Sequence, residues 1–130
     1  MDISESLKTL LKDNDKNSDQ ITGDYHVVQW SPDPFGFERL NIGVVFISNK
    51  NGIPVYKFLE DTSIFNKLYN KDVSFHVNLA CECAKVTIDN HGIESLNFPN
   101  CKQVNGGFAK GKDSIEIIDQ LYKSFFDIYR

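Results

Sequence analysis

The sequence predicts a single α+β domain in which helices cover an antiparallel sheet of three to four strands. Three observations lead to this fold class. The 130 residues are enough for one hydrophobic core and too few for two. Runs rich in β-branched and aromatic residues, typical of strands, fall between residues 25 and 59. After residue 63 the apolar residues recur instead at the three- and four-residue spacing of helices.

The N-terminal end is expected to precede the folded domain. Its apolar residues recur at helical spacing: Ile3, Leu7, Leu10 and Leu11. They predict a short amphipathic helix over residues 1–12, which either docks on the domain or serves as an arm for a partner. The next stretch contains DNDKNSDQ, with no apolar residue, so residues 13–22 are expected to be a polar linker. Residues 23–130 then form the α+β domain.

Three strands are expected at residues 25–30, 41–48 and 55–59. The second is apolar at nearly every position, which is typical of a strand covered on both faces. Its Gly43 leaves room there for another group to approach closely. The NKNG sequence at residues 49–52 favours a tight turn, which makes the second and third strands antiparallel neighbours.

Three helices are expected near residues 63–69, 72–90 and 114–129. Gly92 is expected to end the second of them. An alternative is a hairpin over residues 85–98, because Val, Thr and Ile in that stretch favour strands.

The last helix has the clearest signals. Asp113 can cap it, and Glu116 follows three residues later, as in a capping box. Its broad apolar face comprises Ile115, Ile118, Leu121, Tyr122, Phe125 and Tyr129. The Gly-rich residues 99–112 before it are expected to be irregular, with at most a brief strand at 103–105. Their GGFAKGK run approaches a phosphate-binding loop, but Asp113 replaces the required Ser or Thr, so no nucleotide site is expected.

The charge balance limits the classes of partner. Fourteen basic and eighteen acidic residues give a net charge of -4, so no long-range field draws the molecule onto nucleic acid or anionic lipid. No apolar run approaches the roughly 20 residues of a membrane span. The N-terminus also lacks the basic-then-apolar order of a secretory signal. We therefore expect a soluble, cytoplasmic protein.

The cysteines and histidines raise the question of a metal. Four candidate zinc ligands lie close in sequence: His76, Cys81, Cys83 and His91. In a helix, however, Cys81 and Cys83 would point in nearly opposite directions. The odd number of cysteines also argues against a disulfide framework. We expect reduced core thiols, with no metal and no cofactor.

The loop between the first two strands, SPDPFGFERL, concentrates polar side chains suited to recognition: Asp33, Glu38, Arg39 and, just beyond it, Asn41. Pro32 and Pro34 restrict the backbone, so Asp33 is presented on a stiff segment. The alternative is structural. In that case Asp33 accepts hydrogen bonds from nearby backbone N–H groups, and Asn41 seals the start of the strand.

The same loop carries a family resemblance. Tyr25, the Pro32-Asp33-Pro34 run and the pattern from Glu38-Arg39 to Val45 resemble the opening signature of a bacterial family known as domain of unknown function 3037. The stretch from residue 99 onward is similar to the end of that family. Its members resemble companions of HipA-like kinases. The resemblance therefore implies a toxin–antitoxin or phage-defence setting and a kinase-like protein partner.

These observations favour a non-catalytic regulatory or protein-interaction module that binds through Asp33, Glu38, Arg39 and Asn41. No nucleophile lies beside a base in a catalytic arrangement, so we expect no catalytic residues. One alternative is a metal-dependent phosphodiesterase or nuclease, in which Asp33 and Glu38 hold the cation and Arg39 or Lys50 meets phosphate. A second is a single-stranded nucleic-acid binder, for which the basic and aromatic candidates are Lys102, Phe108, Lys110 and Lys112.

Overall fold

The structure is a computed structural model, which describes residues 20–33, 38–69 and 72–126. Its five-stranded antiparallel sheet has the order β3-β2-β1-β5-β4. The strands are β1 (Ile21–Trp30), β2 (Leu40–Ser48), β3 (Pro54–Phe58), β4 (Asn97–Phe98) and β5 (Cys101–Gly111). The helices are α2 (Ile64–Tyr69), α3 (Ser74–His91), α4 (Ser114–Phe126) and the single turn η1 (Ile93–Ser95). This confirms the α+β fold, with five strands in place of three to four.

The three expected strands and three expected helices are all present. Residues 85–91 continue α3, so the helix is confirmed there and the hairpin alternative is wrong. Gly92 ends α3 with a positive φ of 87°. Strand β1 begins at Ile21, inside the stretch expected to be a linker. The expected helix at residues 1–12 lies outside the described residues.

The main error of the prediction concerns residues 99–112, where β5 is the longest strand of the described chain. The glycines of this stretch indicated irregular structure, but one of them, Gly106, instead forms a β-bulge in β5. The pairing of β1 with β5 shifts register between Tyr25 and His26, opposite Gly106. A Cβ on Gly106 would lie 2.1 Å from the Tyr25 ring, so only glycine lets that ring cross the strand.

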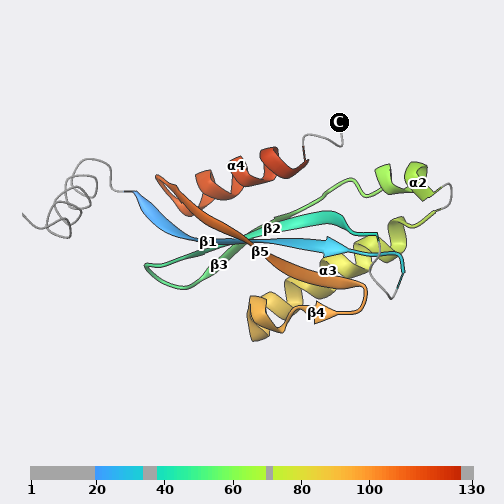
Figure 1. The fold of residues 1–130 in the computed structure, drawn as a ribbon, viewed down its shortest axis with the longest axis horizontal. Coiled ribbons are helices and arrows are strands. Elements are labelled where there is room, and N and C mark those ends of the chain that lie inside the picture. The colour runs from blue at the N-terminus through green and yellow to red at the C-terminus, as the bar shows by residue number, and fades with distance from the viewer. Residues whose placement is uncertain (1–19, 34–37, 70–71, 127–130) are drawn as a thin grey trace, which may run out of the picture.

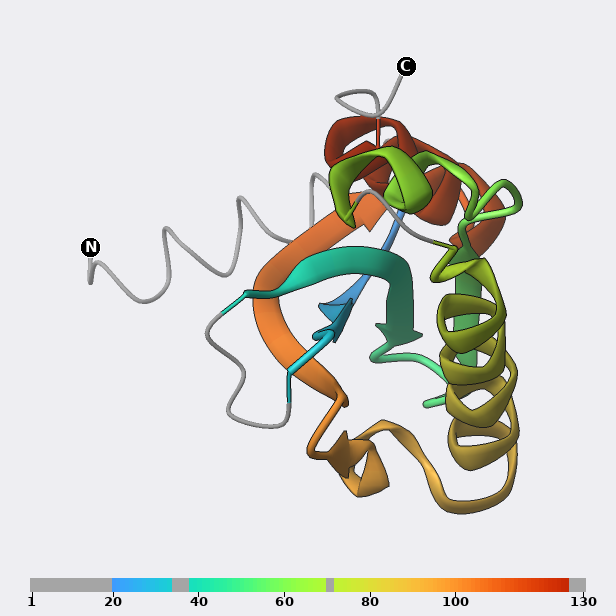
Figure 2. The ribbon, with the colours of Figure 1, turned by 90° about the vertical axis from the view of Figure 1, so that its right-hand side faces the viewer.

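Helices cover both faces of the sheet (Figures 1 and 2). Helix α4 packs on one face, where its Ile117, Ile118 and Phe126 meet Val44 and Phe46. Helix α3 packs on the other, and its buried residues are Val77, Cys81, Ala84 and Ile88. No helix in the described part of the chain is long and apolar enough to span a membrane.

The capping box of α4 is confirmed. The Asp113 carboxylate accepts a hydrogen bond from the Glu116 backbone N–H at 2.8 Å, and the Glu116 carboxylate accepts one from the Lys112 N–H at 3.2 Å. Ile115, however, was expected on the buried face and is 63% exposed. In the same turn Ile117 is 2% exposed, so the helix turns Ile117 and not Ile115 toward the sheet.

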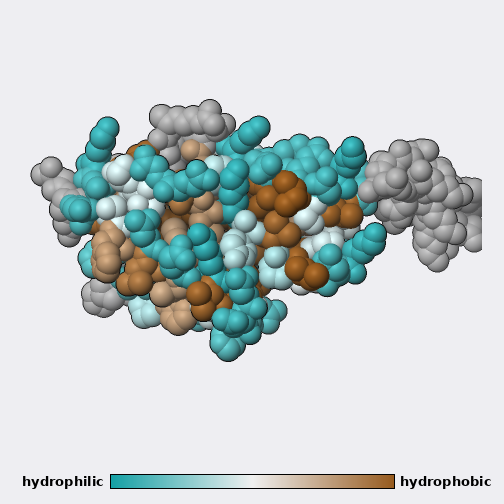
Figure 3. Space-filling model, turned by 180° about the vertical axis from the view of Figure 1, so that it is seen from behind, coloured by the Kyte–Doolittle hydropathy of each residue, from teal (hydrophilic) through white to brown (hydrophobic). Residues whose placement is uncertain are grey.

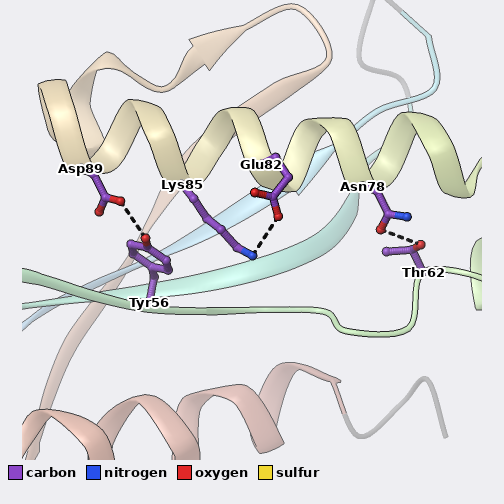
Figure 4. A network of polar contacts seen from close by, with 6 residues as sticks. All are labelled: Tyr56, Thr62, Asn78, Glu82, Lys85 and Asp89. Carbon is purple, nitrogen blue, oxygen red and sulfur yellow. Dashed lines mark hydrogen bonds and ion pairs between the residues drawn. The ribbon is translucent and has the colours of Figure 1, made fainter.

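Polar contacts hold one flank of α3 against β3 and the loop after it (Figure 4). The Tyr56 hydroxyl donates to the Asp89 carboxylate at 3.0 Å. The Thr62 hydroxyl donates to the Asn78 amide oxygen at 3.0 Å. These contacts orient α3, and they leave its other flank facing the turn between β4 and β5.

The close packing of the Phe58 ring on Gly43 can be tested by mutation. A Cβ there would lie 2.4 Å from the Phe58 ring, because the two residues are directly paired across β2 and β3. We expect Gly43→Ala to lower the free energy of unfolding by about 1–3 kcal/mol. Urea unfolding followed by the fluorescence of Trp30, the single tryptophan, measures it. The cost should shrink in a Phe58→Leu background, and an equal cost in both backgrounds would contradict the steric explanation.

Candidate functional site

Two cavities adjoin at the end of the sheet where β1 finishes. Trp30, the last residue of β1, is buried and lines both of them. Its indole stacks on the Phe65 ring at 6.3 Å and meets the Tyr69 ring edge-on at 6.0 Å. Two aromatic residues of α2 therefore hold the indole of Trp30 in place, and Trp30 forms a wall shared by the two cavities.

The first cavity, here called the α3 groove, has a volume of about 290 Å³. It lies between α3 and the turn joining β4 to β5. Its lining is mostly apolar: Trp30, His76, Leu79, Ala80, Cys83, Phe98, Asn100 and Cys101. Leu79 from α3 is 51% exposed, and Phe98 from β4 is 46% exposed. Two large apolar side chains from different elements thus border an open apolar groove.

The second cavity, also about 290 Å³, is more polar. It shares Trp30, His76 and Asn100 with the α3 groove and adds Pro32, Asp72 and Val73. The Asp72 carboxylate accepts hydrogen bonds from the Ser74 hydroxyl at 2.6 Å and the Ser74 N–H at 3.1 Å. Those hydrogen bonds are the main reason that the pKa of Asp72 lies below its usual value. The polar cavity therefore carries a negative charge at the start of α3.

The loop after β1 is anchored beside these cavities. The Ser31 N–H donates to the Asn100 carbonyl oxygen at 2.9 Å, which joins the loop to the β4–β5 turn. The Ser31 hydroxyl donates to the Asp33 carbonyl oxygen at 2.9 Å. Segments far apart in sequence are thus joined at the rim of the site.

The four predicted recognition residues have different surroundings. The Asp33 carboxylate accepts from the Glu38 N–H at 3.4 Å, and Asn41 accepts from the Gln29 side chain at 3.0 Å. Both contacts are of the structural kind that the loop sequence also allowed. Glu38 and Arg39 are exposed. With Leu40 and Tyr69 they line a separate cavity of about 390 Å³.

Cys81 and Cys83 lie on opposite sides of α3, as their two-residue spacing in a helix predicts. Cys81 is buried in the core, and Cys83 is exposed in the α3 groove. The expectation of core thiols is therefore wrong for Cys83. Burial raises the pKa of Cys101 to about 12 and that of Cys81 to about 11. Both buried sulfurs stay protonated at neutral pH, which makes them poor nucleophiles.

The groups named for the two alternative functions come together only in part: Phe108 and Lys110, two residues apart in β5, share one face of the sheet. In residues 20–33, 38–69 and 72–126, no three His, Cys, Asp or Glu side chains are grouped to hold a metal ion. Lys102 pairs with Gln29 and Phe108 pairs with Asp24. Because Gln29 and Asp24 point to opposite faces of β1, Lys102 and Phe108 also lie on opposite faces.

Sequence reasoning missed the α3 groove, although a signal was present. Phe75, Leu79 and Val86 are exposed and lie on the side of α3 opposite its core residues. Figure 3 shows hydrophobic surface in its lower left part, over α3. A helix that is apolar on both sides is expected to have a second packing surface.

Comparisons of the chain with protein-family models, curated proteins and solved structures gave no match.

The three thiols provide a test of this geometry. At pH 7.5 without denaturant, we expect a maleimide to modify Cys83 alone, because Cys81 and Cys101 are buried and protonated. Intact-mass and peptide mass spectrometry count and locate the adduct. Denatured protein should take up three equivalents. Rapid native labelling of a Cys83→Ser variant would contradict the described packing.

Proposed function

We propose that the protein is a non-catalytic regulatory module that binds a protein partner at the Trp30 end of its sheet. The α3 groove carries this proposal, since it is open, apolar and bordered by the exposed side chains of Leu79 and Phe98. Grouped apolar side chains on a surface with a polar rim are typical of protein-binding sites. Phe75 and Val86 extend the apolar surface along α3.

The size and lining of the groove favour a side chain over a metabolite. Its volume of about 290 Å³ is at the low end for small-molecule sites, which run from roughly 300 to 1,000 Å³. It is large enough for one aromatic or leucine side chain of a partner. His76 and Asn100, which line both cavities, lie where hydrogen bonds could surround such an anchor.

Glu38 and Arg39 supply the charged part of the proposed surface. They are exposed beside Tyr69, whose ring packs on Trp30, so they lie at the same end of the sheet as the groove. Charges at the rim of an interface mainly affect association rate and partner choice. Asp33 and Asn41 act in this proposal by holding the loop and strand ends in place.

The class of partner comes from the family resemblance of the loop sequence. A HipA-like kinase is therefore the first candidate, in a toxin–antitoxin or phage-defence setting. An anchor in the groove and ionic contacts at Glu38 and Arg39 would together position such a partner.

The proposal predicts how variants retain a partner. Tagged full-length chain is used to capture proteins from cells of its natural host. We expect Leu79→Glu to retain at least tenfold less of the protein bound by the unchanged chain, because a charge would be buried in an apolar contact. Ile115→Glu is the matched control, since Ile115 is 63% exposed on α4. Quantitative mass spectrometry measures retention.

A second pair of variants tests Phe98, on the opposite side of the groove, and Glu38, in the charged part of the proposed surface. Phe98→Ser should weaken retention as Leu79→Glu does, and Glu38→Lys should weaken it more at low salt than at high salt. Equal retention by the unchanged chain and by Leu79→Glu would contradict the assignment of the groove. Failure of the unchanged chain to retain any protein beyond the tag alone would contradict the proposed function itself.

A further inference from the structure

The α3 side of the sheet is covered over only part of its length. Helix α3 lies beneath the part of the sheet that ends at Trp30 (Figure 1). Its last turn contacts β3 through the hydrogen bond between Asp89 and Tyr56. Beyond this contact the sheet continues toward Ile21, and within the described residues no helix covers that end of the face.

A row of side chains crosses four strands at the border of this uncovered part, where Ile47 still packs partly against the α3-side core. The row runs from Phe108 on β5 to Asp24 on β1, its partner in the β1–β5 ladder. It continues from Asp24 to its β2 partner Ile47, and from Ile47 to its β3 partner Pro54. The residues next to them in each strand pack on the α4 side: Tyr25, Phe46, Val55 and Ala109. Because side chains alternate along a strand, the row faces the opposite side.

The row is more apolar than a solvent-facing strand surface should be. Phe108 is 61% exposed, while Ile47 and Pro54 are only half-buried. The sheet faces that antiparallel proteins leave open to water carry mainly polar side chains. Asp24 and Lys110 place one charge of each sign beside the apolar residues. This pattern fits a surface that is covered by an amphipathic element.

We propose that residues 1–12 of the same chain cover this row as an amphipathic helix. The apolar residues at helical spacing in that segment are Ile3, Leu7, Leu10 and Leu11. A helix of this length is only marginally stable alone in water, so it needs an apolar surface on which to form. The segment also contains both acidic and basic residues, as the border of the row does.

The length of the chain and its point of entry fit this occupant. The described chain enters the sheet at Ile21, and Thr22 lies on the same face as Asp24, one side-chain repeat of about 7 Å away. Residues 13–20 can span up to about 26 Å when extended, which is ample for a return over the face. A helix of residues 1–12 is about 18 Å long. The four strands of the row extend over about 14 Å.

A double-mutant cycle on the full-length chain tests the contact. Leu7→Ala, Phe108→Ala and the double variant are unfolded in urea. We expect Leu7→Ala to raise the unfolding equilibrium constant about three- to tenfold in the unchanged background and by less than half of that factor in the Phe108→Ala background. The matched control is Ile115→Ala, which removes an equally exposed apolar side chain on α4. In that background the effect of Leu7→Ala should be undiminished.

The other outcomes each have a defined meaning. Equal effects of Leu7→Ala in all three backgrounds would overturn the proposal. The cycle is repeated at tenfold lower protein concentration, since an intramolecular contact gives the same coupling at both. Coupling that disappears on dilution would assign the segment to a second copy of the chain and overturn the proposal. Leu7 and Phe108 are not part of the groove surface, so partner retention through Leu79 succeeds or fails independently.

Discussion

The pairing of β1 with β2 on one side and β5 on the other determines the rest of the structure. Through these two ladders, residues 21–30 contact segments from both halves of the chain. The alternation of side chains along β1 assigns Tyr25 to the α4 core and Val28 and Trp30 to the α3 core. The strand ends at Trp30, so the two cavities of the candidate site lie where this ladder stops.

The sequence predicted those elements whose signals are local. The apolar run of β2, the turn at residues 49–52 and the capping box of α4 each act within a few residues, and each is present. Strand β5 was missed because its stability depends on a strand far away in sequence. By local propensity Gly106 disfavours a strand, and its place in β5 is explained only by the Tyr25 ring that lies across it. Local composition cannot convey a requirement that a distant side chain imposes.

The candidate site was predictable in part. The loop after β1 was expected to present Glu38 and Arg39, and both are exposed. The hydrogen bonds that occupy Asp33 and Asn41 depend on how Glu38 and Gln29 are placed by the fold. The groove depends on the approach of Phe98 to Leu79 from elements far apart in the chain. Helical periodicity shows that α3 is apolar on two sides, but it does not show which side the sheet takes.

The position of β5 near the end of the chain has a consequence for biosynthesis. Strands β1, β2 and β3 form a meander that a ribosome completes early, whereas β1 gains its second neighbour only after β5 emerges. Until then one edge of β1 has unpaired backbone groups that can join another chain. Because ladders between distant segments form slowly, the nascent protein passes through a stage that is sensitive to aggregation and chaperone supply.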